Sequence, residues 1–255
     1  MNILMLGDIF GRPGRQIVAQ YLPKLKQKYD PALIVANGEN AAGGFGLTKK
    51  VAEELFALGI HVLTSGNHIW DQKEMLTYIQ IEPRILRPAN YPPMVPGASV
   101  YLHETEQGRI GVINLIGRVF MQDYDCPFRT ADQILEELPD DVKHVVIDFH
   151  GEATSEKIAL ARYLDGRVSA VVGTHTHVLT ADEQILPQGT AYITDLGMCG
   201  PIDGILGVEP TTVINKFLTQ LPTRFSVAKG PAQLTGVVIT LDSLGAAEQI
   251  LRLKF

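Results

Sequence analysis

The chain has 255 residues, 45% of them hydrophobic and 20% charged, which is the composition of an ordinary globular protein. That length suits one large α/β domain over residues 1–255 and is short for two full domains. The formal net charge of −6 argues against a stable complex with nucleic acid, since such binding needs a basic face. It does not argue against a small phosphate ester that lies next to bound cations.

The cysteines and the first apolar segment bear on the cellular compartment. Cys126 and Cys199 are far apart and form no metal-binding motif, so we expect free thiols in a reducing cytosol, with one disulfide as the alternative. The first apolar run is too short for a signal peptide or a membrane span, and Asp8 and Gly11 interrupt it. We therefore expect a cytoplasmic protein that does not enter membranes.

Three units of strand, polar loop and helix open the chain. Thr48 is expected to cap the second helix and Gly59 to end it, while Pro23 should kink or interrupt the first. A glycine-rich loop covers residues 43–46. The repeated pattern predicts a parallel α/β sheet with ligands at the carboxyl ends of its strands. The expected strands cover 2–6, 32–36 and 60–64, and the expected helices cover 15–28 and 48–58.

The middle and the end of the chain add hairpins to this α/β pattern. Segments 98–103 and 109–115 alternate around a turn at 106–108, which predicts an antiparallel hairpin. Residues 117–130 form an irregular segment with many aromatic and polar residues, which we interpret as a covering loop. Together these elements predict two mixed sheets packed face to face, with helices outside. The later elements are strands at 143–149, 168–172 and 190–194, helices at 155–164 and 210–221, and a hairpin of 234–241 with 247–254.

Side chains of the types that bind metals follow five of the expected strands. Their donors are oxygen and imidazole nitrogen without thiolate, which suits ions such as iron, manganese, zinc or cobalt. Without His68, seven candidates remain, too many for one tetrahedral ion and about right for two ions that share a carboxylate. His175 and His177 are two residues apart, so only a loop conformation lets each reach a different ion. The full set is Asp8, Glu39, Asn40, Asn67, His68, His150, His175 and His177.

The order of these residues resembles that of the calcineurin-like metallophosphoesterases, and within them the YmdB-like branch. The matching motifs are GDIFGRPGR at 7–15, NGENAAGGFG at 37–46, SGNHIWD at 65–71 and GTHTHV at 173–178, so that the resemblance runs over most of the chain. It implies a four-layer α/β/β/α sandwich, two divalent or trivalent metal ions and hydrolysis of 2′,3′-cyclic nucleotides. Iron is the expected metal, with manganese and zinc as alternatives.

Three positions depart from the general pattern of the larger family. Phe10 stands where an imidazole ligand is usual, and Asn40 is expected to take the place of that lost ligand. Glu39 stands where the family usually has an aspartate. Ile69 stands where an acidic residue usually follows the catalytic histidine, and Asp71 is a candidate substitute.

The resemblance also implies a role for each site residue. Glu39 would bridge the two ions, and a hydroxide between the ions would attack phosphorus. His68 would act as the catalytic residue that protonates the leaving oxygen. Asp8, Asn40 and His177 would complete the first metal site, and Asn67, His150 and His175 the second. Substrate contacts are expected from Gly44, Arg118 and Tyr124, beside a small phosphodiester such as a cyclic nucleotide.

Several alternatives stay open at this point. The same fold could serve a phosphomonoesterase or a nuclease, because cations recognise phosphate and not the rest of the substrate. A metal-binding regulatory protein with little turnover is the alternative from a different class. Asn37 and Thr174 could support the ligands through hydrogen bonds or could only form turns. A homo-oligomer is expected on general grounds alone.

Overall fold

The computed structural model describes residues 1–255, and its first sheet has five strands in the order β14-β13-β1-β3-β4. β1 pairs in parallel with β3 and antiparallel with β13, so the C-terminal hairpin of β13 and β14 extends the sheet beyond the first strand. This mixed pairing agrees with the sequence-based expectation. The strands are β1 (Asn2–Leu6), β3 (Leu33–Asn37), β4 (Val62–Thr64), β13 (Thr235–Leu241) and β14 (Ala247–Lys254).

The second sheet has six strands in the order β5-β6-β7-β8-β10-β9. Its middle strands β6, β7, β8 and β10 are parallel, and the hairpin of β5 and β6 is antiparallel as predicted. The strands are β5 (Val100–Thr105), β6 (Gly108–Ile116), β7 (His144–His150), β8 (Ala170–Thr174), β9 (Gln184–Ile185) and β10 (Ala191–Ile193).

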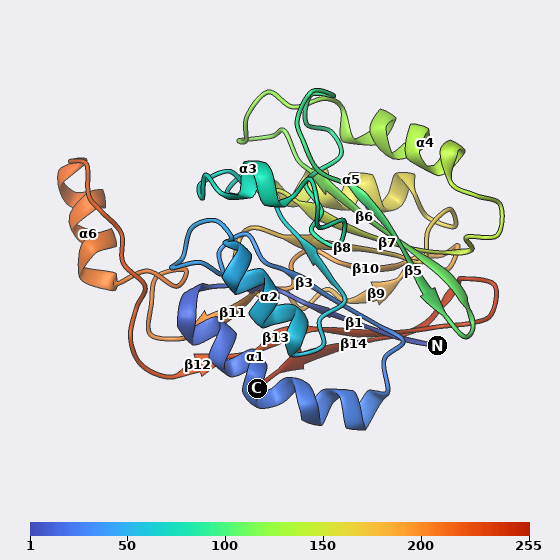
Figure 1. The fold of residues 1–255 in the computed structure, drawn as a ribbon, viewed down its shortest axis with the longest axis horizontal. Coiled ribbons are helices and arrows are strands. Elements are labelled where there is room, and N and C mark those ends of the chain that lie inside the picture. Colours follow the sequence, from blue (N-terminus) through green and yellow to red (C-terminus); the bar gives the residue numbers. More distant parts are fainter.

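The two sheets pack face to face, and helices cover their outer faces (Figure 1). Between the sheets lies an apolar layer that includes Ile3 and Met5 from β1 and Val146 from β7. Alternate residues of β1 point the other way, so Leu4 packs under the helices of the first sheet. The predicted four-layer α/β/β/α sandwich is therefore confirmed. The helices are α1 (Gly11–Tyr29), α2 (Lys49–Ala57) and α3 (Met75–Tyr78) on the first sheet, and α4 (Pro127–Glu137) and α5 (Thr154–Tyr163) on the second.

Local details differ from the expectation at three places. A third, three-stranded sheet has the order β12-β11-β2, with β2 (Asp8–Ile9), β11 (Met198–Pro201) and β12 (Ala232–Gln233). α1 starts at Gly11 and continues through Pro23 as one helix, so Pro23 does not interrupt it; the buried face packs along the sheet on both sides of that residue. The irregular segment ends sooner than expected, since α4 begins at Pro127. Thr48 caps α2 as predicted, by accepting a hydrogen bond from the backbone N–H of Val51.

One helix stands away from the sandwich. α6 (Pro210–Thr219) projects at the side opposite the N-terminus (Figure 1), and Phe217 and Leu218 on it are 80% and 77% exposed. None of the helices combines the length and the apolar character that crossing a bilayer requires.

Buried hydrogen bonds join the two sheets near the carboxyl ends of their strands. Asp148 on β7 accepts from the Asn37 side chain of β3 at 3.2 Å and from the Thr64 hydroxyl of β4. Asp148 is 2% exposed, so these bonds lie in a low-dielectric interior where they fix the relative position of the sheets. The segments that follow β1, β3, β4, β7 and β8 consequently meet in one place.

Candidate metal centre

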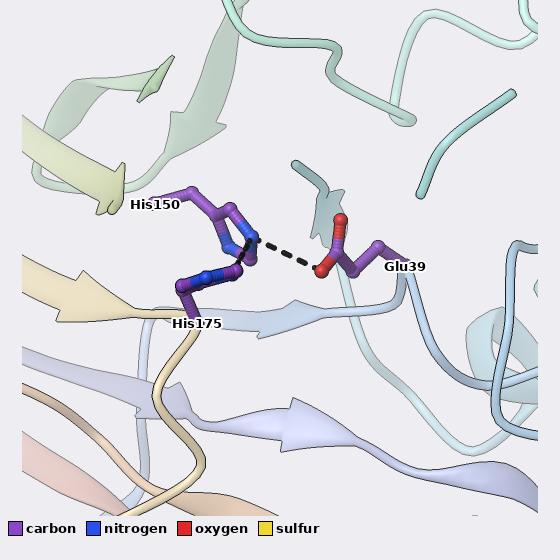
Figure 2. A group of neighbouring side chains, drawn as sticks. All are labelled: Glu39, His150 and His175. Atoms are coloured by element: carbon purple, nitrogen blue, oxygen red, sulfur yellow. Dashed lines mark hydrogen bonds and ion pairs between the residues drawn. The ribbon is translucent and has the colours of Figure 1, made fainter. Parts of the chain in front are cut away.

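Three ligand-type side chains from both sheets converge at this place. Glu39 follows β3, His150 ends β7 and His175 follows β8, and their donor atoms all lie within 4.8 Å of one another (Figure 2). His150 Nε2 is 3.0 Å from Glu39 Oε1 and 3.0 Å from His175 Nδ1. Asn67 adds its Oδ1 at 3.1 Å from the same nitrogen. Four of the predicted residues therefore surround one small volume.

The remaining predicted ligands form a second group that also contacts Glu39. Asn40 Nδ2 lies 3.3 Å from Glu39 Oε1 and 3.3 Å from His177 Nε2. His177 Nε2 in turn lies 3.8 Å from Asp8 Oδ1. All seven residues that the sequence suggested as ligands are thus neighbours in space, with Glu39 in contact with both groups.

Each histidine turns one ring nitrogen toward the cluster and the other toward an oxygen outside it. The outer contacts are His150 Nδ1 to Thr174 Oγ1 at 3.0 Å, His175 Nε2 to Glu152 Oε2 at 3.1 Å, and His177 Nδ1 to the Leu206 carbonyl at 3.1 Å. The Thr174 hydroxyl donates to Asp148 at 2.7 Å, so its oxygen is free to accept from His150. Metal-binding histidines have this arrangement, in which an outer acceptor fixes the N–H and leaves the inner nitrogen as a donor to the ion.

The chemistry of the cluster fits bound cations. Asp8 Oδ1 is buried and has no hydrogen-bond partner, although an isolated buried carboxylate oxygen is costly. His150 Nε2 and His175 Nδ1 face each other over 3.0 Å, so the two imidazoles are close enough to bind one cation together. Two ligand atoms that each lie about 2.1 Å from one ion, with a right angle between the two bonds, are about 3.0 Å apart, as these two nitrogens are.

The titration properties of the cluster point to the same need for positive charge. Burial raises the pKa of Asp8 well above its usual value, because a charged carboxylate is poorly solvated there. Burial opposes the charged form of His150 as well, but the carboxylates of Glu39 and Asp8 outweigh it and raise the pKa of this ring to about 9. Glu39 and His150 therefore hold opposite charges beside each other, while the buried Asp8 carboxylate would need further positive charge, such as a bound cation, to ionise.

His68 lies beside the cluster and not in it. Its backbone N–H donates to Glu39 Oε2 at 2.9 Å, and its ring Nδ1 is 2.7 Å from Asp71 Oδ2. Ile69, which occupies the place of the usual acidic neighbour, is fully buried in the core under α2 and α3. Asp71 therefore contacts the ring of His68, and its role as a substitute for the missing acidic neighbour stays a prediction.

The cluster opens into a cavity of about 260 Å³. Its lining combines His68 and four of the ligand-type residues with the apolar side chains of Phe45, Leu206, Val208 and Phe225; the four are Glu39, Asn40, His175 and His177. Phe45 meets the His68 ring edge to face at 5.3 Å. A hollow of about 320 Å³ near the end of α4 contains no such group of ligand-type residues. The chemistry therefore belongs to the smaller cavity.

The three residues suggested as substrate contacts have different places. Gly44 lines the cavity, with a φ of 95° that few other residues adopt. Arg118 and Tyr124 are not among the lining residues. The Arg118 backbone donates to Glu156 at 3.0 Å, and Tyr124 is buried with its hydroxyl 3.3 Å from that of Tyr91.

Sequence reasoning missed several residues around the cluster. Glu152, which contacts His175, lies two positions after His150, and that spacing was the one available signal. Asp148 was inside a strand, and Leu206 acts through its backbone carbonyl, so neither had a recognisable pattern. Asn37 and Thr174, which were open between support and turn formation, donate hydrogen bonds to Asp148.

Comparisons with known proteins agree on one family. The family model described as "YmdB-like protein" matches residues 4–253. The chain is 52% identical over 242 residues to the 2′,3′-cyclic-nucleotide 2′-phosphodiesterase of Bacillus subtilis (strain 168), covering 95% of this chain and 92% of that relative. A solved structure of a novel phosphatase from Mycoplasma pneumoniae has a TM-score of 0.94 and 34% identity, over 100% of this chain and 93% of the other.

A more distant structure is similar in fold alone. The 5′-nucleotidase precursor of Thermus thermophilus has a TM-score of 0.59 and 15% identity, over 100% of this chain and 54% of the other. The sandwich is therefore shared at low sequence identity, and the site must be argued from this chain's own residues.

Proposed function

The chain belongs to the YmdB-like protein family, and from this premise we propose that it is a di-metal phosphodiesterase that hydrolyses 2′,3′-cyclic nucleotides. The name of the Bacillus subtilis relative supports this substrate, and the small cavity favours a small diester over a polynucleotide. The net charge of −6 also disfavours a long polyanion, which would need basic tracks outside the cavity. We further propose a single domain over residues 1–255, a cytoplasmic location and a homo-oligomeric state.

The observation that carries the proposal is the buried Asp8 Oδ1 without a hydrogen-bond partner, facing a set of nitrogen and oxygen donors. In the proposed assignment, Glu39 would contribute to both cation sites. Asp8, Asn40 and His177 would hold one cation with it, and Asn67, His150 and His175 the other. Iron is the expected metal, with manganese and zinc as alternatives, since nitrogen and oxygen donors suit all three.

Cations bound there would offset the charge of the phosphate oxygens and lower the pKa of a water molecule toward neutrality. The residues of the chain orient the substrate against them. His68 is outside the ligand set and lines the cavity, with Nδ1 directed to Asp71 and therefore Nε2 left for the substrate. The contacts with Asp71 and Phe45 fix the ring in one orientation, which a proton donor requires.

The proposed reaction opens the five-membered cyclic phosphate. Water adds to phosphorus, the bond from phosphorus to O2′ breaks, and the phosphate stays on O3′. The departing 2′ oxygen takes the proton from His68 Nε2, and the water loses one proton to solvent. The product is a nucleoside 3′-phosphate, and no oxidant or second substrate is needed.

A substrate panel tests the proposal. Purified protein loaded with iron or manganese should hydrolyse 2′,3′-cyclic AMP to the 3′-phosphate, and should hydrolyse bis-p-nitrophenyl phosphate. It should leave p-nitrophenyl phosphate unchanged, and chelation should remove both activities. Elemental analysis should give about two ions per chain, as the ligand count suggests.

The alternatives have their own outcomes in the same panel. Turnover of p-nitrophenyl phosphate alone would identify a phosphomonoesterase, for which one Mycoplasma relative, 38% identical over 251 residues and named as a phosphatase/phosphodiesterase, gives a precedent. Cleavage of long single strands in preference to the cyclic nucleotide would identify a nuclease. Two bound ions without any turnover would favour a regulatory protein.

A further inference from the structure

The segment that presents His175 and His177 has an unfavourable backbone. We call residues 174–178 the histidine loop. His175 has a φ of 100° and His177 a φ of 65°, and side chains with a Cβ atom rarely adopt such values. Residues keep such a conformation only where their surroundings impose it. The contacts of this loop therefore decide whether the two imidazoles reach the cluster.

A buried ion pair lies directly against the backbone of this loop. Lys157 of α5 and Asp195, which follows β10, are 1% and 0% exposed, and their charged atoms are 2.8 Å apart. The Lys157 ammonium also donates to the Thr174 carbonyl at 2.8 Å. Asp195 accepts from the backbone N–H of Thr176 at 3.0 Å and from that of Gly197 at 2.8 Å. The pair thus bonds to the peptide groups on both sides of His175.

The Lys157 side chain also occupies a space that exists because residue 173 is a glycine. A Cβ atom at Gly173 would lie 2.9 Å from Lys157 Cδ and 1.8 Å from the Thr194 carbonyl oxygen. The aliphatic part of Lys157 therefore packs on the backbone at Gly173, just before the histidine loop, and its ammonium group bonds to the first residue of that loop.

Stability alone gives a weak reason for such a pair. Two charges lose their hydration on burial, and well-packed apolar side chains often replace buried pairs without loss of stability. What apolar side chains do not provide is a donor for Thr174 and an acceptor for Thr176 in fixed directions.

We propose that Lys157 and Asp195 are positioning residues, which hold the histidine loop in the conformation that makes His175 and His177 metal ligands. The inference rests on the proposed metal-dependent function. Loss of the pair should weaken metal binding and not substrate contact, because neither Lys157 nor Asp195 lines the cavity.

Metal binding to the folded, metal-free protein tests the inference. The variants are Lys157→Met, Asp195→Leu and the double variant with both changes, in which no buried charge is left without its partner and which is the one expected to fold best. Calorimetric titration with Mn²⁺ should show affinity reduced about 10- to 100-fold in each folded variant, the usual effect of losing a residue that orients ligands. Nitrogen-15 NMR of the imidazoles should show that His175 and His177 no longer have one fixed tautomer each.

The matched control is Glu156→Gln, which changes the neighbouring buried residue on the same helix. Glu156 bonds to the backbone of Arg118 and Val119 and not to the histidine loop, so Mn²⁺ affinity should stay at the wild-type value. A folded double variant with wild-type Mn²⁺ affinity and fixed imidazole tautomers would overturn the inference, and so would equal losses in the control. If the wild-type protein itself binds no metal, the proposed function fails first.

Discussion

A methyl group added at Gly66 should disable the cluster by displacing one imidazole. Gly66 precedes Asn67, and a Cβ atom there would lie 2.2 Å from His150 Cδ2 and 2.3 Å from Nε2. Ordinary contacts start near 3.4 Å, so in Gly66→Ala the ring must retreat by about 1 Å. A displacement of about 1 Å in a catalytic arrangement costs about 100-fold in rate, and overpacking costs about 1–3 kcal/mol in stability. Both losses should therefore appear together.

The assay compares Gly66→Ala with Gly151→Ala, a change at the residue that follows His150 in the chain. A Cβ atom at Gly151 would meet nothing closer than Gly117 Cα at 3.5 Å, which is an ordinary contact. We expect Gly151→Ala to keep the wild-type rate on 2′,3′-cyclic AMP and the wild-type metal content. Gly66→Ala should lose about 100-fold in kcat and bind metal more weakly. If Gly66→Ala matched the wild type in rate and in metal content, the reasoning from ring overlap would be wrong.

Three further predictions concern the site, and a fourth concerns His61, which precedes β4 and lies outside the site. The metal-free Asp8→Asn variant should melt at a higher temperature than the metal-free wild type at pH 7, because the change removes an ionisable group whose burial is costly. Added Mn²⁺ should raise the melting temperature of this variant less than that of the wild type. Equal metal-induced shifts in the two proteins would contradict this. His68→Asn should keep the wild-type metal content and lose about 10²- to 10⁴-fold in kcat, and full activity would rule out the proton-donor role. Glu152→Gln should reduce metal affinity about 10-fold or more, measured by titration, because the acceptor for His175 Nε2 is weakened; unchanged affinity would show that this contact is incidental. Burial lowers the pKa of His61 to about 4, so the unfolded chain binds more protons between pH 6.5 and 4 and stability falls as pH falls through that range. The His61 share of that fall should be about 1–2 kcal/mol after allowance for its partial exposure, and urea unfolding of His61→Phe should depend less on pH there.

The strand ends contained most of the information that sequence reasoning could use. A buried strand such as β1 has a clear apolar run, and the polar residue after it, Asp8, marks the carboxyl end. Because parallel strands place these ends together, five separate patterns predicted one common place without any knowledge of contacts. The assignment of ligand roles stays a prediction, since it depends on ions.

Features that arise from tertiary contact were beyond the reach of a single sequence. β2 and β11 are too short to show alternation, and they pair only because the chain after β10 returns to Asp8. The left-handed backbone of His175 has no local cause, since it depends on Asp8, Lys157 and Asp195 from other segments. Pro23 does not interrupt α1, because packing outweighs the loss of one helical hydrogen bond.

The origin of the cluster in both sheets has a consequence for the order of events in folding. His175 bonds to Asp8 across 167 residues of chain, and Asn37 bonds to Asp148 across 111. Contacts so distant in sequence form late, because a large loop must close before any of them contributes. A cation therefore meets its full set of ligands only after the two sheets have joined. Bound ions should slow the unfolding of the finished protein and leave its rate of folding almost unchanged.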